Sequence, residues 1–397
     1  MAIQFSDEHI TIDTLGELIR FGEVFGGLQN ISLEHAIQDE KKNVLIAAKR
    51  PLRENLILAL ENRQDLSKYT FVIEKSSNLR SFLASKISME IEKKLMLADF
   101  SFAGWLMRRK NVDIFQTVRA SLYNDFFFIT LAKLFYEGQP ILGHLMETAL
   151  LSVGLYVDLE ANARINDINV IFMAAMLHDY ALFSDKNWEE RDSFPSDGHD
   201  IESAALLQGK KIPEVIPKIL RHSNKLTNRY EDLNQGDNKI KWTFTFEELA
   251  QNILLLCEYF SFLRRTLGGE ETEQKVIDIL FQLGHQSEHG AFPLAVSRAF
   301  AHHYEKYLSF FEYGQKIAQV EKACKWERFA LAYPKPRATQ VLCKDHHVAC
   351  PLRQHTNRIT IVQTENQVIN RFGEKLLPGE YDKCQLSDKL PTPPEVL

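Results

Sequence analysis

Hydrophobic residues recur at helical spacing through the middle of the chain. Between about residues 78 and 316 they are separated mostly by three and four positions, which is the period of an α-helix with a buried face. Pro140 and Gly143 interrupt the pattern shortly before a histidine, and such residues are typical of helix ends and turns. The pattern predicts an all-helical domain over residues 96–318.

The two ends of the chain have a different pattern. Near the start, Asn43–Ala48 and Tyr69–Ile73 are short runs rich in β-branched or aromatic residues, which favour strands. We predict a small α+β module with a linker helix over residues 1–95. Residues 319–397 contain several prolines and four of the five cysteines, and Arg358–Gln363 alternates like a strand. A small β-containing extension is therefore expected there, and the predicted fold class is mainly α.

Composition narrows the class of protein. The chain has 397 residues, 45% hydrophobic and 25% charged, with a net charge of −6. A net negative chain is a poor default ligand for nucleic-acid phosphates or anionic lipid. No apolar run reaches the roughly 18 residues that span a bilayer, and the first residues lack a basic, apolar leader. With an odd, small number of cysteines, we expect a reduced, cytoplasmic protein that binds neither membrane nor long nucleic acid.

The chemistry lies in histidines and carboxylates at the ends of apolar helical stretches. His178-Asp179 directly follows the apolar run VIFMAAML, and burying such groups without partners is costly. A metal ion would supply the partner, since imidazole and carboxylate ligands suit iron, manganese and zinc. For each histidine taken by itself, the alternative is an ordinary polar or core residue. The predicted metal ligands are His144, His178, Asp179, His199, His222 and Glu258.

This set of ligands predicts hydrolysis of a phosphoester, with His178 and Asp179 as the central catalytic residues. A metal ion lowers the pKa of a bound water, and a pair of ions roughly 3.5–4 Å apart clamps the attacking and leaving oxygens. Four histidines and two carboxylates would suffice for two ions.

Four segments resemble successive parts of the HD superfamily of metal-dependent phosphohydrolases, and in particular its bacterial HD-GYP branch. They are HLMETALLSVGLYV, AAMLHDYAL, GHDIESAALLQGKKIPEVIPKILRHSN and NILLLCEYFSFLRR. The resemblance implies two divalent ions, iron or manganese, bridged by Asp179. His144, His178 and Glu258 would complete one site, and His199 and His222 the other. It further implies that metal-bound hydroxide hydrolyses cyclic di-GMP, a signalling molecule, or a related nucleotide phosphoester.

The sequence also departs from the HD-GYP pattern. Leu182 stands where the family has a lysine, Ser223 replaces the second histidine of a pair, and the Gly-Tyr-Pro signature is absent. Glu258 stands where the family usually has aspartate. These departures favour an alternative, in which a degenerate HD-GYP-like protein acts as a non-catalytic nucleotide sensor or signalling partner.

Further residues are candidates for contacts with ligands and partners. Lys225, Arg264 and Arg265 would contact a small anionic nucleotide substrate, and the other expected partners are a second copy of the chain or a signalling protein. In the extension, thiols and an imidazole offer the ligand types of a structural zinc site, with free thiols as the alternative. That candidate set is Cys343, His346, Cys350 and Cys384. The adjacent pair His302-His303 is predicted to lie on the surface.

Overall fold

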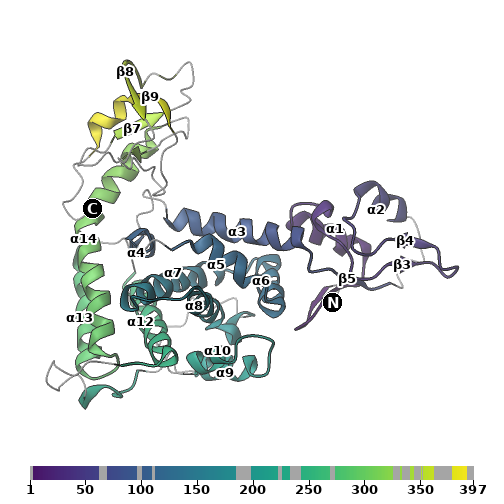
Figure 1. The fold of residues 1–397 in the computed structure, drawn as a ribbon, viewed down its shortest axis with the longest axis horizontal. Coiled ribbons are helices and arrows are strands. Elements are labelled where there is room, and N and C mark those ends of the chain that lie inside the picture. Colours follow the sequence, from purple (N-terminus) through teal and green to yellow (C-terminus); the bar gives the residue numbers. More distant parts are fainter. Residues whose placement is uncertain are drawn as a thin grey trace.

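The structure is a computed structural model of the whole chain. The residues that it describes are 3–61, 69–95, 101–109, 112–184, 198–221, 226–232, 243–268, 273–324, 331–332, 340–343, 350, 352–361 and 378–390. Small sheets lie toward both ends of the chain, and helices make up the part between them (Figure 1). The predicted fold class, mainly α with a small sheet in each terminal region, is confirmed.

The N-terminal region contains two antiparallel sheets. One has the order β1-β2-β5, and the other pairs β3 with β4. The strands are β1 (Ile3–Phe5), β2 (Ile10–Ile12), β3 (Ile37–Gln38), β4 (Val44–Ile46) and β5 (Phe71–Ile73). The helices are α1 (Leu15–Val24), η1 (Leu28–Asn30) and α2 (Glu54–Glu61). The Thr14 hydroxyl accepts a hydrogen bond from the Glu17 amide at the start of α1, which satisfies one of the free donors at a helix N-terminus.

A long helix, α3, leads from this region into the helical body (Figure 1). The helices are α3 (Ser77–Leu95), α4 (Phe102–Arg109), α5 (Ile114–Ser121), α6 (Asp125–Glu137), α7 (Leu142–Leu159), α8 (Ile165–Leu177), η3 (Tyr180–Leu182), α9 (His199–Leu207), α10 (Val215–Leu220), α12 (Phe246–Thr266), α13 (Glu273–Glu288) and α14 (Leu294–Lys322). The central helix is α7, which packs against α4, α8 and α12. Because α7 is buried on nearly every side, its polar residues lie in the core and need partners there.

Aromatic rings join three of these helices. Phe102 of α4 lies 5.5 Å from Phe260 of α12, 5.2 Å from Phe300 and 4.9 Å from Tyr304, measured between ring centroids. All four rings are almost completely buried. Aromatic side chains of this size contribute a large share of the apolar area in a core. This cluster therefore fixes α14 and α4 against α12, which carries one of the candidate metal ligands.

The N-terminal region also contacts the turn between α9 and α10. Asp7 and Glu8, in the turn between β1 and β2, form ion pairs with Lys210 and Lys211 respectively. These pairs join segments that are far apart in the sequence. They place the first hairpin against the part of the helical body that follows α9.

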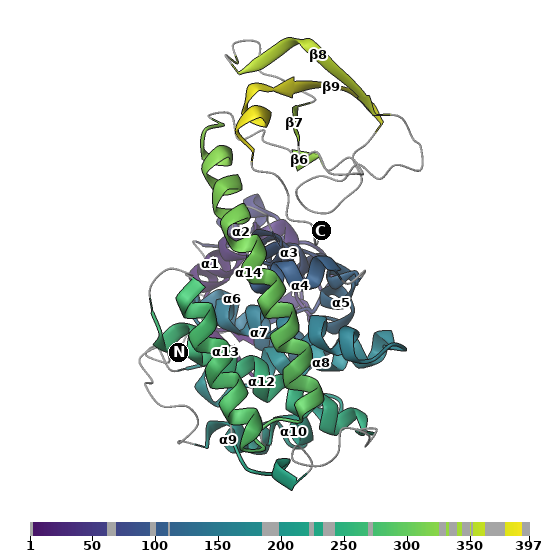
Figure 2. The same ribbon diagram turned by 90° about the vertical axis from the view of Figure 1, so that its left-hand side faces the viewer.

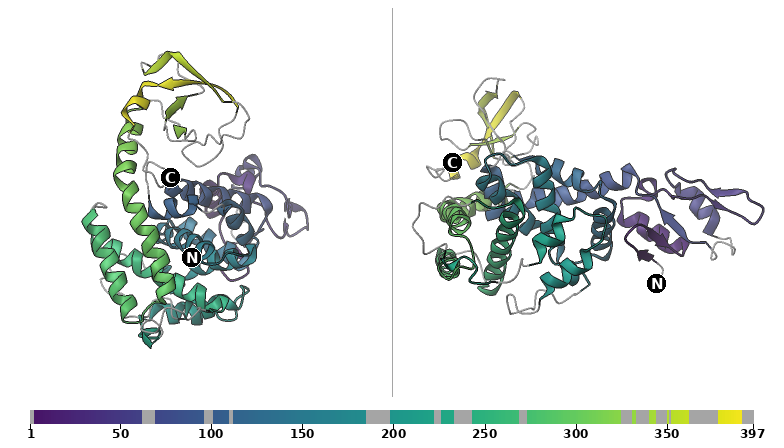
Figure 3. Two further views of the ribbon diagram at one scale, coloured as in Figure 1. Left: turned by 60° about the vertical axis from the view of Figure 1, so that its left-hand side comes forward. Right: turned by 60° about the horizontal axis from the view of Figure 1, so that its bottom comes forward.

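The C-terminal region forms a four-stranded antiparallel sheet of order β6-β7-β9-β8. Its elements are β6 (Leu331–Ala332), β7 (Gln340–Cys343), β8 (Arg353–Ile361), β9 (Gly379–Cys384) and the short helix η5 (Gln385–Lys389). Helix α14 runs from the helical body to this sheet (Figures 2 and 3). Among the described residues, none of the helices combines the length and the apolar character that crossing a membrane requires.

Candidate metal centre

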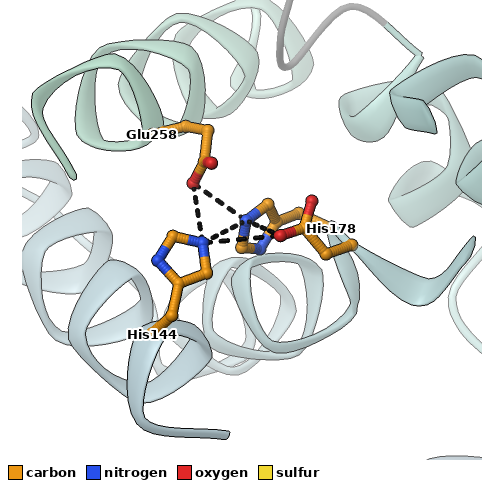
Figure 4. Close-up of side chains that lie close together, drawn as sticks. His144, His178 and Glu258 are labelled. Carbon is orange, nitrogen blue, oxygen red and sulfur yellow. Dashed lines mark hydrogen bonds and ion pairs between the residues drawn. The ribbon is translucent and has the colours of Figure 1, made fainter. Parts of the chain in front are cut away.

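Three helices carry four ionisable side chains to one point in the core. His144 lies in the first turn of α7, and Glu258 lies on α12. His178 and Asp179 directly follow the last residue of α8. Residues 171–177 of α8 are all buried, so the end of this helix, and the His-Asp pair with it, lies inside the protein. Figure 4 shows the imidazoles of His144 and His178 facing the carboxylate of Glu258.

The ligand atoms converge closely. The Nε2 atoms of His144 and His178 are 3.2 Å apart, and Glu258 Oε2 lies 3.2 Å from the first and 2.9 Å from the second. Asp179 Oδ2 lies 3.4 Å from His144 Nε2 and 3.3 Å from His178 Nε2. One potential ligand atom from each residue lies within 4.8 Å of all the others. We call His144, His178, Asp179 and Glu258 the four-residue centre.

Hydrogen bonds on the far side of each imidazole fix its orientation. His178 Nδ1 lies 2.6 Å from the Ala175 carbonyl oxygen, which can only accept, so Nδ1 carries the hydrogen. His144 Nδ1 lies 3.1 Å from the Ser261 hydroxyl. Both rings therefore present Nε2 to the centre. This is the usual arrangement for metal-binding histidines, whose other ring nitrogen is held by a partner outside the site.

The four-residue centre fits a divalent cation. Asp179 Oδ1 and Glu258 Oε2 are buried and have no hydrogen bond of normal geometry among the described residues, although histidine Nε2 atoms lie 3.0 and 2.9 Å from them. With Nδ1 protonated, a neutral imidazole turns the lone pair of Nε2 toward these carboxylates and toward the other ring. Lone pairs and anions repel one another at such distances unless a positive charge lies between them. A proton supplies this charge in the metal-free centre, where the pKa of both histidines is raised, and a metal ion supplies it when bound. Two imidazole nitrogens and two carboxylates are ligands that suit iron, manganese or zinc.

The pKa values at the centre show how strongly the four groups interact. Burial by itself would lower the pKa of His144, but the nearby carboxylates outweigh this effect and raise the pKa to about 9. The pKa of His178 is raised well above its usual value by Asp179 and Glu258, again against the effect of burial. The same contacts lower the pKa of Asp179 and of Glu258, although burial opposes them. The carboxylates are therefore ionised, as metal ligands need to be.

A fifth predicted ligand lies on the other side of Asp179. His199 begins α9, and its Nε2 lies 3.0 Å from Asp179 Oδ1, whereas His144 and His178 face Oδ2. The Ser203 hydroxyl accepts a hydrogen bond of 3.0 Å from the Ala181 amide, which holds α9 beside the segment that follows Asp179. Both carboxylate oxygens of Asp179 are thus turned toward histidines. The sixth predicted ligand, His222, lies outside the described residues.

The segment that holds these residues can be compared with known families. Residues 141–260 match the family model of the HD domain. The match begins just before α7, ends on α12, and includes all members of the four-residue centre. Proteins with this domain are generally metal-dependent phosphohydrolases. The match therefore supports the assignment of this segment to the HD superfamily and a hydrolase activity of this kind. The search of curated proteins and the search of solved structures each gave no match.

The three basic residues that were predicted to contact the substrate lie in different surroundings. Arg264 forms an ion pair with Glu147 of α7, and its guanidinium lies 5.7 Å from the centre of the Phe260 ring. Arg265 is the next residue on α12 and is half-buried. Lys225 lies outside the described residues. The charge of Arg264 is therefore matched by a carboxylate within the HD domain.

The sequence patterns do not predict the role of Ser261 or the burial of His303. Ser261 fixes the His144 ring, but a single serine on an apolar helix carries no signal of its own. The prediction of a surface position is wrong for His303. This residue is 6% exposed, and its Nε2 atom lies 2.7 Å from Asp158 Oδ2. His302 is exposed as predicted. The burial of the next residue, Tyr304, shows that this side of α14 faces the core.

Proposed function

We propose that the HD domain hydrolyses a phosphodiester bond of cyclic di-GMP or of a related nucleotide phosphoester, with two divalent cations, iron or manganese. The observation that carries this proposal is the buried four-residue centre with His199 on the second oxygen of Asp179. A carboxylate with His144 and His178 on one oxygen and His199 on the other is suited to bind two cations.

The residues have distinct roles in this proposal. His144, His178, Asp179 and Glu258 would hold one cation, and His199, which faces the other oxygen of Asp179, would hold a second. Bound cations supply Lewis acidity and a nucleophilic water for attack on a phosphoester. The hydrogen bonds to Ala175 and Ser261 keep the imidazole rings in the orientation that binding requires. The cations also give a locally positive potential for an anionic nucleotide, although the whole chain has a net charge of −6.

The test compares two aspartates at opposite ends of α8. Purified protein is loaded with manganese or iron, its metal content is measured, and turnover of cyclic di-GMP and of a simple aryl phosphodiester is followed by chromatography. We expect Asp179→Ala to lose bound metal and turnover. Asp167→Ala is the matched control, because Asp167 lies in the first turn of α8 and its carboxylate accepts a hydrogen bond from the Tyr156 hydroxyl, away from the four-residue centre. Full turnover in Asp179→Ala would contradict the bridging role.

A specific observation favours a second candidate, a non-catalytic nucleotide sensor. Leu182, which replaces the lysine of the HD-GYP pattern, is only 6% exposed and belongs to the apolar core. Its position supplies no positive charge for a phosphate group. A sensor of this kind would act through a second copy of the chain or a signalling protein. Calorimetric binding of cyclic di-GMP to metal-loaded protein without turnover would favour the sensor, and metal-dependent turnover would exclude it.

A further inference from the structure

The thiols predicted to hold a structural zinc ion do not gather at one point of the described structure. Among the residues that the structure describes, Cys343, Cys350 and Cys384 belong to no group of three potential ligands close enough to share one ion. They form no disulfide, and His346 lies outside the described residues. The zinc site therefore stays a prediction from the sequence alone.

A closed turn near the start of the chain presents two carboxylates to the helical body. The Ser6 amide donates a hydrogen bond of 2.9 Å to the His9 carbonyl, and the His9 amide donates one of 2.9 Å to the Ser6 hydroxyl. Asp7 and Glu8 lie between them, at the tip of the β1–β2 hairpin. Lys75 Nζ donates a hydrogen bond of 2.7 Å to the Glu8 carbonyl. The tip is thus held in place by its own turn and by the chain that follows β5.

The two carboxylates reach neighbouring lysines that differ in their surroundings. Asp7 pairs with Lys210, whose side chain is 27% exposed. Glu8 pairs with Lys211, whose side chain is 79% exposed. Lys210 Nζ also lies 5.9 Å from the centre of the Phe126 ring on α6, within the range of a cation–π contact. Because solvent and salt screen exposed pairs most strongly, Lys210 is the lysine whose charge acts on the packing beneath it.

The ring beneath Lys210 leads toward the four-residue centre. Phe126 is 2% exposed, and its ring centroid lies 5.9 Å from that of Tyr180. Tyr180 begins η3 and directly follows Asp179. Closely packed interiors transmit small displacements from one side chain to the next. The position of Lys210 is therefore linked through two aromatic rings to the segment that carries Asp179.

A second link runs along α9, a helix of nine residues. Its first residue, His199, faces Asp179 Oδ1 at 3.0 Å. In its middle, the Ser203 hydroxyl accepts a hydrogen bond of 3.0 Å from an amide of η3. Its last residue, Leu207, is completely buried, and the Leu207 carbonyl accepts a hydrogen bond of 3.1 Å from the Lys210 amide. One end of α9 thus lies at the metal centre and the other at Lys210.

We propose that Lys210, held by Asp7 of the N-terminal hairpin, is a positioning residue that keeps His199 directed at the second oxygen of Asp179. Without the charge of Lys210, α9 and the turn after it would be held less firmly against η3, and the second cation would lose part of its coordination. The proposal rests on the two-cation centre proposed above. It makes the N-terminal region part of the control of the second cation, although that region contributes no ligand.

Three substitutions in the same turn separate this role from a general effect. Lys210→Met keeps an unbranched chain on the Phe126 ring but removes the charge, Lys210→Arg keeps the charge, and Lys211→Met is the matched control. Manganese binding to each full-length protein is titrated by the electron paramagnetic resonance of the free ion. We expect Lys210→Met to raise the dissociation constant of the second cation about three- to fivefold, with a much smaller change for the first. Lys210→Arg and Lys211→Met should bind both cations as the wild type does.

Salt provides a further readout that a purely structural role of the side chain would not give. Added salt screens an ion pair between partly exposed groups. The difference in second-cation affinity between wild type and Lys210→Met should therefore shrink as the salt concentration rises. Binding of the first cation reports that each variant is folded.

Hydrogen exchange on metal-free protein tests the same role without metal or substrate. The Ala181 amide is bonded to the Ser203 hydroxyl, so a less firmly held α9 should let this amide exchange faster. We expect faster exchange of Ala181 and of α9 in Lys210→Met than in Lys211→Met or the wild type, followed by mass spectrometry of peptides. Equal exchange in all three proteins would overturn the role of Lys210.

The outcomes keep this proposal apart from the proposed phosphodiesterase. Two bound cations without turnover of cyclic di-GMP would contradict the phosphodiesterase and leave the role of Lys210 intact. Equal second dissociation constants in Lys210→Met and the wild type would overturn the role of Lys210, whether or not the protein is active. An equal loss in Lys211→Met would also overturn it, because the effect would then belong to the turn as a whole. Binding of a single cation by the wild type would remove the second site and this role with it.

Discussion

Removal of the divalent cation should make the stability of the HD domain fall as pH rises from 6.5 to 9. In the metal-free centre the pKa of His144 is raised from 6.5 to about 9 by the carboxylates around it. A group whose pKa is higher in the folded than in the unfolded state stabilises the fold fully below its unfolded pKa. That contribution is lost as pH rises through the folded pKa, which here gives a window from about 6.5 to 9.

The size of the effect follows from the same values. Each pH unit between the two pKa values corresponds to 1.36 kcal/mol, so a rise from 6.5 to about 9 gives about 3 kcal/mol for His144. His144 is only 8% exposed, so solvent screens this interaction little. His178 acts in the same direction, because its pKa is also raised. Asp179 and Glu258 have lowered pKa values, and their contributions are lost only as pH falls into the acidic range.

The assay is urea unfolding at several pH values between 6 and 9.5, on protein treated with a chelator and on protein loaded with manganese. The metal-loaded protein should show a much smaller decrease, because a cation on Nε2 replaces the proton. His144→Gln should remove part of the decrease in metal-free protein, and His285→Gln, at an exposed position on α13, should not. A free energy of unfolding that stays constant or rises from pH 6.5 to 9 in metal-free protein would refute this reasoning.

Three further predictions concern single residues. Ser261→Ala should weaken manganese binding about tenfold, as measured by competition with a metal indicator. Ser261→Thr keeps the hydroxyl that bonds to His144 and should bind manganese as the wild type does. Equal affinities in all three proteins would contradict this role of Ser261. Phe102→Ala should lower the free energy of unfolding by about 3–5 kcal/mol, because the ring is 1% exposed among other aromatic rings; a loss below about 1 kcal/mol in urea unfolding would be inconsistent with that packing. Cys257 should resist thiol reagents in native protein at pH 8, since burial raises its pKa to about 12, and rapid labelling located by mass spectrometry would count against its burial.

The helical body is the part of the fold that the sequence predicts best. Apolar residues at three- and four-residue spacing identify buried helices such as α7 and α8 because the period of the pattern equals that of the structure. The ends of helices are less certain. The glycine at 143 suggests an interruption, yet α7 begins at Leu142, because a glycine in the first turn removes little from a helix that tertiary packing holds in place.

The candidate metal ligands are predictable where they coincide with the ends of apolar helices. His178-Asp179 stands out for this reason, and the structure brings it together with His144 and Glu258. Ser261 and Ala175 hold the imidazoles but cannot be recognised in the sequence, because their role depends on how α7 and α12 cross and on where α8 ends. The ion pairs between the first hairpin and the α9–α10 turn cannot be predicted from the sequence either, since they depend on tertiary packing between distant segments.

A contribution to stability does not by itself explain the four-residue centre. Four ionisable groups in a helical core lose their hydration, and replacing buried ion pairs by apolar side chains of similar volume is often neutral or stabilising. The surrounding residues of α7, α8 and α12 are apolar enough to pack without them. In the metal-free centre, two buried carboxylate oxygens lack a hydrogen bond of normal geometry. Two imidazoles whose pKa values are raised toward protonation also face each other, with their Nε2 atoms 3.2 Å apart. A cation removes both defects at once, which connects the burial of these groups directly to metal-dependent chemistry.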